Sequence, residues 1–281
     1  MKQTYIFVDA SYFIFFRYYA LKSWWGLAHR DEELNTSENT VFKEKFIKTV
    51  EEKLKELPKK LGIKKGTPYK MFFGKDCPQS RIWRFEHHSS YKEGRPDSTE
   101  VGHYFALTYK EKLFESLAGD SCILFQDRLE ADDVIALSVR HILETAKAAD
   151  EIYVVTGDMD YIQLANDPRV HLYDLKFKSL RDKSKYFKEH GNPEKDILIK
   201  CIGGDKSDNI PAAFPKCGKK TAEKLAAMDD GALFAELARK DGLAQFHKNV
   251  TLVCFSEIPK ELSEPFIESH KHLFQEKTIF D

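Results

Sequence analysis

Two aspartates, Asp205 and Asp208, lie three residues apart in the glycine-rich segment 201–211, CIGGDKSDNIP. Seven further acidic residues follow short apolar segments elsewhere in the chain: Asp9, Asp76, Glu130, Asp132, Asp133, Asp158 and Asp160. Any one of them could be an ordinary surface or helix-capping residue. Gathered in one place, such carboxylates would repel one another unless cations lay among them. Carboxylate oxygens suit Mg²⁺ or Mn²⁺, and two such ions about 4 Å apart direct water onto a phosphodiester.

The elements that must position these acids are short, continuously apolar strands. Residues 5–8, 71–73, 122–125 and 152–156 have this character, which indicates a sheet covered on both faces. Helical periodicity lies between them, over 41–57 up to Pro58 and over 133–149. Strands that alternate with helices predict an α/β fold with a mostly parallel sheet. Ligands of such sheets bind beyond the carboxyl ends of the strands, so the seven acids are expected to converge on one edge.

Two regions differ from this pattern. Residues 81–112 contain no clean strand and are rich in basic and aromatic side chains, which predicts an insertion that is helical in parts. From residue 194 onward the chain is expected to be helical, with helices at 194–202, 219–228 and 231–240 and less regular segments to Phe280.

Composition excludes several classes of protein. The five cysteines of the 281 residues are scattered and never form a Cys-x-x-Cys pair, which argues against a disulfide framework and a zinc finger. No apolar run approaches a membrane span, and the N-terminus lacks a signal-peptide pattern. We therefore expect a soluble intracellular protein.

The net charge of −1 becomes informative once the nine acids are set aside. The remaining 36 acidic residues face 44 lysines and arginines, a surplus of eight positive charges. Outside its predicted metal site the protein is basic, as expected of a protein that binds a phosphate backbone.

The ordered motifs resemble those of a known family. IFVDAS, FFGKDCPQSRIWR, YKEGR, LEADDVIA, VTGDMD and GGDKSDNIP followed by GKKTAEKL are similar to the 5′-nuclease superfamily, which includes flap endonucleases, phage 5′–3′ exonucleases and the 5′-nuclease domain of bacterial DNA polymerase I. The resemblance spans Asp9 to about Leu225. It implies a PIN-like nuclease domain over 1–193 with a helical arch at about 80–112. It also implies a helical DNA-binding module over 194–281, with a helix-three-turn-helix at about 198–228.

The resemblance also assigns roles to the acids. It implies that Asp9, Asp76, Glu130 and Asp132 serve a first metal ion, with Asp133 adjoining, and that Asp158, Asp160, Asp205 and Asp208 serve a second. Two or more Mg²⁺ or Mn²⁺ ions are expected. Asp9 and Asp76 are expected to act in catalysis together with Lys92 and Arg95 of YKEGR, which match basic residues that engage the scissile phosphate.

Further residues are expected to contact DNA. Arg81 and Arg84, and more weakly His87 and His88, match a strand-threading region, while Trp83, Phe85 and Tyr91 fit either base stacking or core packing. Contacts to the phosphates of duplex DNA are expected from the helix-three-turn-helix, namely from Lys216, Gly218, Lys219, Lys220 and Thr221.

The chain departs from the family pattern at two places. The family hairpin has the form Gly-x-x-Gly-x-Gly, whereas residues 212–218 are one residue longer and retain only one of those glycines. This weakens the expectation of a K⁺ ion held by hairpin carbonyls. The family also often has an arginine seven residues after the first aspartate, whereas Arg17 lies eight after Asp9. One residue is about 100° of helix rotation, so Arg17 is equally compatible with packing or a surface position.

We therefore expect a metal-dependent 5′ nuclease that acts as a 5′–3′ exonuclease, a flap endonuclease or both, in DNA replication, repair or recombination. Its substrate would be DNA with a 5′ end, flap or nick. A monomer is expected, and any polymerase or sliding clamp would be a separate chain. The alternatives are a 5′–3′ exoribonuclease or PIN-type RNase, which matched RNA and DNA strands would distinguish, and an inactive DNA-binding scaffold, which metal-dependent turnover would exclude.

Overall fold

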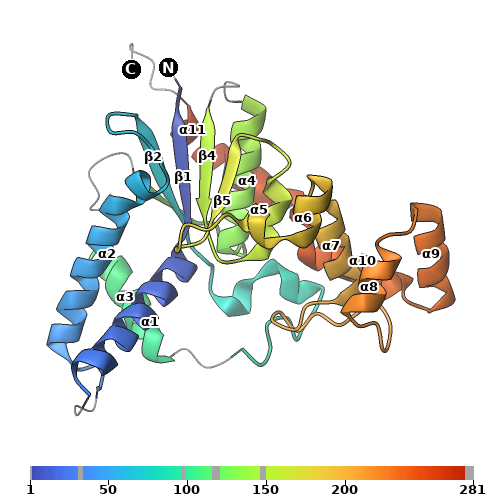
Figure 1. Ribbon diagram of the computed structural model, residues 1–281, viewed down its shortest axis with the longest axis horizontal. Helices are drawn as coiled ribbons and strands as arrows, with labels where there is room; N and C mark the ends of the chain where they lie inside the picture. The colour runs from blue at the N-terminus through green and yellow to red at the C-terminus, as the bar shows by residue number, and fades with distance from the viewer. Residues whose placement is uncertain (1, 31–33, 96–98, 116–120, 146–149, 276–281) are drawn as a thin grey trace.

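A five-stranded parallel sheet forms the centre of the computed structural model (Figure 1). The structure describes residues 2–30, 34–95, 99–115, 121–145 and 150–275. The strands are β1 (Thr4–Asp9), β2 (Tyr69–Gly74), β3 (Ser121–Leu124), β4 (Glu151–Val155) and β5 (Val170–Tyr173). Their order is β3-β2-β1-β4-β5. The predicted α/β class and the parallel sheet are confirmed.

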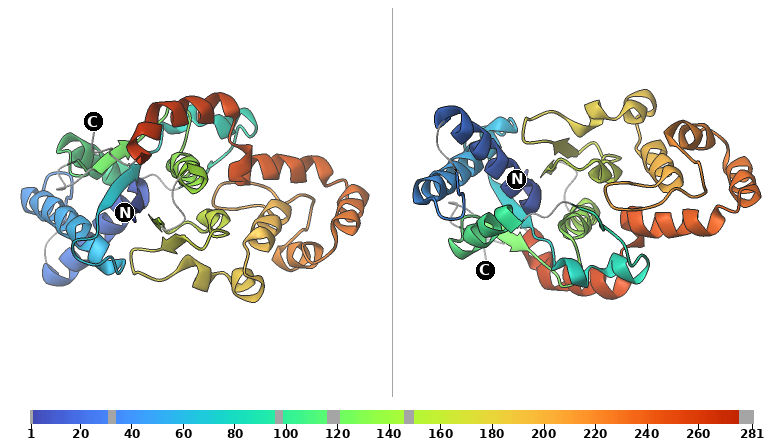
Figure 2. Two further views of the ribbon diagram at one scale, coloured as in Figure 1. Left: turned by 90° about the horizontal axis from the view of Figure 1, so that it is seen from above. Right: turned by 90° about the horizontal axis from the view of Figure 1, so that it is seen from below.

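Both faces of the sheet are covered, as the apolar strands indicate. Along β1, Tyr5 and Phe7 pack into one apolar layer and Ile6 and Val8 into the other, because successive side chains of a strand point to opposite faces. The second layer is closed by α1 (Ala10–Ala28), α2 (Thr40–Lys60) and α3 (Thr99–Lys110). The first is closed by α4 (Ala131–Thr145) and α11 (Lys260–Phe274), as the two views of Figure 2 show.

Several boundaries differ from the sequence-based expectations. Pro58 does not end α2, which continues to Lys60. Proline has a helical φ, and its carbonyl still accepts a hydrogen bond from Ile63 N at 3.0 Å. The predicted helix 133–149 begins at Ala131, and residues 146–149 lie outside the described residues. Strand β5 was not predicted, because it has only four residues, of which alternate ones are buried.

The region expected to form an arch contains short helical turns. It includes η1 (Gln79–Arg81) and η2 (Trp83–Glu86) and ends with α3, while residues 96–98 lie outside the described residues. Two further 3-10 segments follow later in the chain, η3 (Met159–Leu164) and η4 (Phe255–Glu257). No helix among the described residues is both long enough and apolar enough to cross a membrane.

A third apolar cluster lies beside the sheet domain and is built mainly from helices (Figure 1). After the sheet the chain forms α5 (Leu180–Lys183), α6 (Lys185–His190), α7 (Glu194–Gly203), α8 (Lys219–Leu225), α9 (Asp230–Arg239) and α10 (Leu243–Val253). The cluster draws on α7 to α10 and also on Tyr91 and Ile82 of the segment around η2. The helices expected at 194–202, 219–228 and 231–240 agree with α7, α8 and α9 to within three residues.

The last helix does not belong to this cluster, so the expected module 194–281 is too long. Helix α11 returns to the sheet, where Phe266 and Phe274 join the core of the first layer. The ring of Phe274 packs edge-on against Phe72 at 5.3 Å, and Tyr5 Oη donates a hydrogen bond to its carbonyl at 2.9 Å. The apolar face of α11 is therefore buried against the sheet domain, and residues 276–281 lie outside the described residues.

Candidate metal centre and nucleic-acid interface

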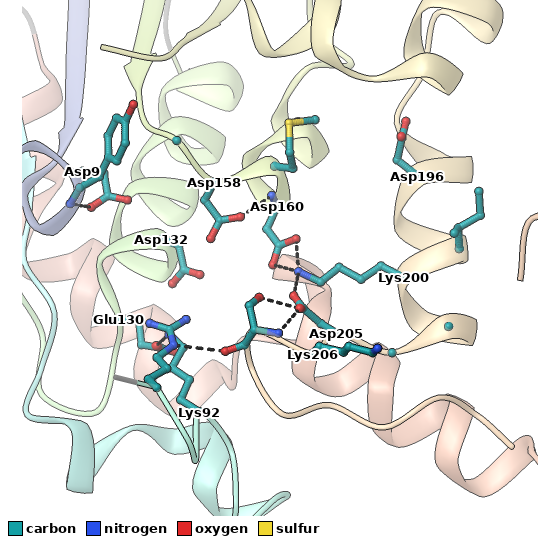
Figure 3. Close-up of a pocket in the computed structure, with 18 of the residues that line it drawn as sticks. Asp9, Lys92, Glu130, Asp132, Asp158, Asp160, Asp196, Lys200, Asp205 and Lys206 are labelled. Carbon is teal, nitrogen blue, oxygen red and sulfur yellow. Dashed lines mark hydrogen bonds and ion pairs between the residues drawn. The ribbon is translucent and has the colours of Figure 1, made fainter. Parts of the chain in front are cut away.

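A cleft of about 1040 Å³ opens at the carboxyl edge of the sheet, between the strands and helix α7 (Figure 3). Seven of the nine predicted acids line it: Asp9, Asp76, Glu130, Asp132, Asp158, Asp160 and Asp205. Strand ends supply most of them, and the turn after α7 supplies Asp205. The structure thus brings together side chains that are up to 196 residues apart in the sequence.

Two of these aspartates are held by the helices that they begin. Asp9 ends β1 and is the N-cap of α1, where its Oδ1 accepts a hydrogen bond from Tyr12 N at 3.0 Å. Asp158 caps η3 in the same manner, accepting from Asp160 N at 2.9 Å. Thr156 Oγ1 donates to the second oxygen of Asp9 at 3.2 Å. Because each strand turns directly into a helix, both carboxylates are fixed at the cleft.

The start of α4 supplies the next group. Asp76 follows β2 and accepts a hydrogen bond from Ala131 N at 2.8 Å, while Ser11 donates to its other oxygen. This bond joins the end of β2 to the N-terminus of α4, where the helix dipole favours negative charge. Asp132 lies in the first turn of the same helix and also lines the cleft.

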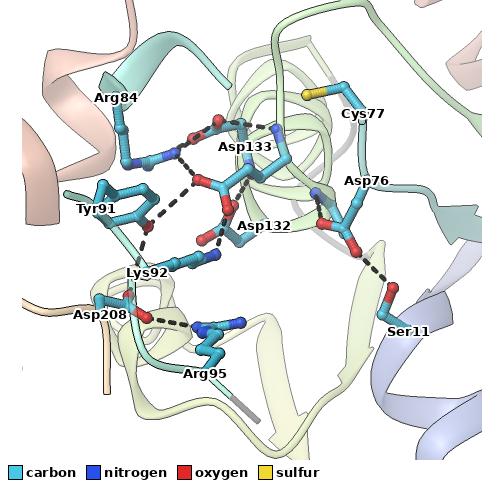
Figure 4. Close-up of polar contacts among 12 residues, drawn as sticks. Ser11, Asp76, Cys77, Arg84, Tyr91, Lys92, Arg95, Asp132, Asp133 and Asp208 are labelled. Carbon is cyan, nitrogen blue, oxygen red and sulfur yellow. Dashed lines mark hydrogen bonds and ion pairs between the residues drawn. The ribbon is translucent and has the colours of Figure 1, made fainter. Parts of the chain in front are cut away.

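Asp133 and Arg84 do not take the positions expected of a metal ligand and a DNA contact (Figure 4). Asp133 is fully buried and is not part of the cleft lining. Its oxygens accept hydrogen bonds from Trp83 Nε1 at 2.9 Å and from Arg84 at 2.7 and 2.9 Å. Arg84 is only 1% exposed and also pairs with Glu130 at 2.7 Å, so it cannot contact DNA in this structure. The acid and the base neutralise each other beneath the cleft.

Lys92 and Arg95 lie at the mouth of the cleft, each beside an acid. Lys92 Nζ pairs with Glu130, and Arg95 pairs with Asp208. Asp208 is buried and is not itself part of the cleft lining. Its other oxygen accepts a hydrogen bond from Tyr91 Oη at 3.4 Å. Both basic side chains would therefore have to exchange an acidic partner for a substrate phosphate.

The aromatic residues of this region pack inward. Trp83 and Tyr91 are buried, and Phe85 packs edge-on against Tyr91 at 5.9 Å. Base stacking on Trp83 or Tyr91 is thus excluded in this structure, and the core-packing alternative holds for both. Arg81, in contrast, is exposed and pairs with Asp127, which leaves its predicted DNA contact open.

Lys200 of α7 lies in the cleft, although the sequence did not indicate it as a site residue. Its Nζ lies 2.5 Å from Asp160 Oδ1 and 2.6 Å from Asp205 Oδ2 (Figure 3). It joins an acid of the sheet to an acid of the helical cluster. No local signal reveals this contact, because Asp160 precedes Lys200 by forty residues.

The turn that carries Asp205 depends on Gly204. This glycine has a φ of +74°, and a Cβ added there would lie 2.4 Å from Ile210 O. The close approach allows Asp205 and Ile210 to exchange two backbone hydrogen bonds, of 2.9 and 2.7 Å. The segment GGDKSDNIP is therefore a tight β-bridged turn that presents Asp205 to the cleft.

The following hairpin contains a lysine with left-handed backbone geometry. Lys216 adopts a φ of +62°, a left-handed conformation that glycine usually provides. Gly218 is the N-cap of α8, and the side chains expected to contact DNA are exposed around it: Lys216, Lys219, Lys220 and Thr221. Their contacts with DNA stay a prediction. Arg17 is not part of the cleft lining, and its guanidinium stacks over the ring of Phe16 at 4.6 Å.

Uncompensated negative charge marks the centre of the cleft. Burial, and next the neighbouring Asp76, raise the pKa of Asp9 to about 7. Burial, and next Asp133, raise the pKa of Asp132 well above its ordinary value. Asp160 has its pKa raised to about 6 by burial in spite of Lys200. Several carboxyl groups with raised pKa values therefore lie close together. Such a group fits a site for divalent cations, which would offset the negative charge of the ionised carboxylates.

Two compact groups of acid oxygens could hold such ions. The oxygens of Glu130, Asp132 and Asp133 lie within 4.8 Å of one another, as do those of Asp160, Asp205 and Asp208. In the first group the oxygens of Asp133 are already used by Arg84 and Trp83. We therefore expect Asp132, with Asp9 and Asp76 nearby on the same cleft wall, to be the main metal-facing side chains there.

The raised pKa of Asp9 predicts a pH dependence of the metal-free protein. Its folded pKa of about 7 exceeds the unfolded value of about 3.9. Between these values the folded state binds more protons, so the free energy of unfolding falls as pH rises from about 4 through about 7. Melting curves in EDTA should show a lower melting temperature at pH 7.5 than at pH 5.5, and Asp9→Asn should reduce this difference. Equal pH dependence in both proteins would contradict the assignment.

The parallel α/β domain carries its acidic cleft at the carboxyl ends of the strands, where such folds bind ligands, and the oxygen-rich lining is suited to divalent cations. Residues 4–192 match the family model described as "5'-3' exonuclease, N-terminal resolvase-like domain". The chain belongs to this 5′–3′ exonuclease family.

Relatives and solved structures agree with this membership. DNA polymerase I of Bacillus caldotenax is 30% identical over 234 residues, which is 80% of this chain and 23% of that protein. A 5′–3′ exonuclease of Buchnera aphidicola is 35% identical over 95 residues, 34% of this chain and 31% of that protein. These matches span less than a third of either relative. A bacteriophage T5 flap endonuclease, crystallised with DNA and metal ions, superposes with a TM-score of 0.60 at 16% identity, over 97% of this chain and all of that one.

Proposed function

We propose that this protein is a divalent-metal-dependent 5′ nuclease that hydrolyses DNA phosphodiesters, as a 5′–3′ exonuclease, a flap endonuclease or both. The observation that carries the proposal is the cleft in which seven acids from four strand ends and one helical turn face one another. Family membership and the names of the relatives support the same reaction. A role in DNA replication, repair or recombination follows from the substrate.

Mg²⁺ or Mn²⁺ is the metal that this oxygen-rich cleft fits best. Asp9, Asp76, Glu130 and Asp132 would hold one ion, and Asp158, Asp160 and Asp205 would hold a second, with Asp208 behind them. When bound, the ions supply a more acidic water for attack on phosphorus and offset charge on the leaving oxygen. A K⁺ ion in the hairpin is less favoured, because residues 212–218 retain only one of the glycines of the family pattern.

The basic residues of the cleft would orient the substrate. Lys92 and Arg95 lie next to Glu130 and Asp208, so a phosphate entering from the cleft mouth would meet two cations on one side and the carboxylates on the other. Cations placed beside the reacting phosphate offset the negative charge that grows in the transition state. Lys92 and Arg95 are therefore the side chains proposed to contact the reacting phosphate directly, without a metal ion between them.

Duplex DNA would lie against the start of α8. Exposed lysines and the backbone amides at the helix N-terminus are suitable for phosphate contacts that carry no sequence information. We assign the nuclease domain to residues 1–193 together with α11, and the DNA-binding module to about residues 194–259. A monomer suffices for this arrangement, and a polymerase or sliding clamp would be a partner of it.

Digestion of 5′-end-labelled DNA tests the proposal. A flap, a nicked duplex and a blunt duplex are each incubated with Mg²⁺ or with EDTA, and product lengths are compared. We expect Mg²⁺-dependent products: mononucleotides or short oligomers for an exonuclease, and the released flap for an endonuclease. A matched RNA strand tests the exoribonuclease alternative. Absence of cleavage with Mg²⁺ and with Mn²⁺, alongside retained DNA binding, would favour the inactive scaffold.

A further inference from the structure

Lys200 occupies the place where the proposed function requires a cation. Its ammonium lies 2.5 and 2.7 Å from the two oxygens of Asp160 and 2.6 Å from Asp205. Its side chain is 21% exposed, so this contact is largely shielded from water. Asp160 and Asp205 thus direct three oxygen contacts at one ammonium group, which is an arrangement that a divalent ion would also use.

The two halves of the cleft differ in this respect. Within the described residues, no lysine or arginine pairs with Asp9, Asp76, Asp132 or Asp158. The Asp160–Asp205 half already contains its own positive charge, and Asp208 behind it is paired with Arg95. An ammonium and a metal ion cannot share the same oxygens at these distances, since both require direct contact and repel each other. One half of the cleft is therefore open to a cation, while the other is occupied.

We propose that Lys200 is a built-in counter-ion of the second metal position and must leave Asp160 and Asp205 before an ion binds there. This inference rests on the proposed function and adds an order of binding to it. The first ion binds beside Asp9, Asp76 and Asp132, with which no lysine or arginine of the described residues pairs. The second binds weakly in the free protein, because Lys200 has to lose two acidic partners.

A substrate phosphate would give the displaced ammonium a new partner. Lys200 lines the same cleft as Lys92 and Lys206, where a bound DNA phosphate would face it. Second-ion binding and DNA binding should therefore favour each other, since each supplies what the other displaces. Lys200 acts in this scheme as a positioning residue that weakens the binding of the second ion until DNA is bound.

Manganese titration without DNA tests the proposal directly. Electron paramagnetic resonance counts free Mn²⁺ over metal-free protein, for the wild type, Lys200→Met and Lys206→Met. Lys206 lines the cleft but, within the described chain, does not pair with Asp160 or Asp205, so it is the matched control. We expect one tight and one weak ion in the wild type and in Lys206→Met. In Lys200→Met the second ion should bind about tenfold more tightly or better, within the 5- to 150-fold range of coupled sites.

A second measurement uses the wild type alone, in case Lys200→Met folds poorly. Acetylation by acetic anhydride, read by mass spectrometry, should modify Lys200 slowly in EDTA and several-fold faster at saturating Mg²⁺. An unchanged second affinity in a folded Lys200→Met, or a Lys200 reactivity that Mg²⁺ does not change, would overturn this inference alone. If no Mn²⁺ bound to the wild type at all, the proposed function itself would fail.

Discussion

Asp158→Asn is expected to abolish measurable cleavage, with a fall in rate of at least about 100-fold, comparable to the loss of one key electrostatic group in other enzymes. Asp158 is exposed in the cleft, and within the described residues no lysine or arginine pairs with it. Its charge is therefore available to a metal ion. The substitution removes the negative charge and replaces one carboxylate oxygen by an amide nitrogen, while the size of the side chain stays the same.

The fold should survive this change. Asp158 Oδ1 caps η3 by accepting from Asp160 N, and an asparagine oxygen can accept the same hydrogen bond. We expect the melting temperature in EDTA to stay the same or rise, because one of several crowded negative charges is removed. Loss of activity would then report on chemistry rather than on folding.

The measurement compares single-turnover cleavage of a 5′-labelled flap at saturating Mg²⁺, alongside DNA affinity by fluorescence anisotropy in Ca²⁺. Asp182→Asn serves as the control, because Asp182 is exposed on α5 outside the cleft lining. DNA affinity should change by less than about threefold in both variants, which corresponds to a change in binding free energy of less than about 0.7 kcal/mol. Cleavage by Asp158→Asn at a rate close to that of Asp182→Asn would refute the placement of the metal centre.

Arg84→Met is expected to destabilise the protein by about 3–5 kcal/mol, the cost of breaking a buried ion pair from one side. The guanidinium pairs with Glu130 at 2.7 Å and with Asp133 at 2.7 Å, and its Nε donates to Leu252 O at 2.9 Å. Its removal would leave two acids buried beneath the cleft, with Glu130 retaining Lys92 and Asp133 retaining only uncharged donors.

Arg81→Met is the matched control for this variant. Arg81 lies three residues earlier and also pairs with an acid, Asp127, but the side chains are 60% and 39% exposed. Exposed pairs contribute about 0–1 kcal/mol. Urea unfolding in EDTA should therefore separate the two variants by more than about 2 kcal/mol, the gap between these two ranges. Equal urea midpoints for Arg84→Met and Arg81→Met would show that the buried ion pairs of Arg84 stabilise the fold no more than the exposed pair of Arg81.

Features that depend on residues close together in the sequence could be predicted, whereas features that depend on contacts between distant residues could not. Strands such as 5–8 were visible because a run of apolar residues is a local property. The cleft acids were predictable for the same reason, since parallel strands bring their carboxyl ends to one edge. Arg84 was expected to contact DNA, and only its contacts with residues 46 and 49 positions later reveal that it is buried. Lys200 was missed for this reason as well.

The return of α11 to the sheet has a mechanical consequence for strand entry. The module of α7 to α10 is joined to the sheet domain at both of its ends, because α11 returns to the sheet. The module can therefore rotate relative to the sheet domain only about the axis through these two connections. The hydrogen bond from Arg84 to Leu252 adds a third fastening. We therefore expect the two sides of the cleft to keep nearly the same separation when a ligand binds.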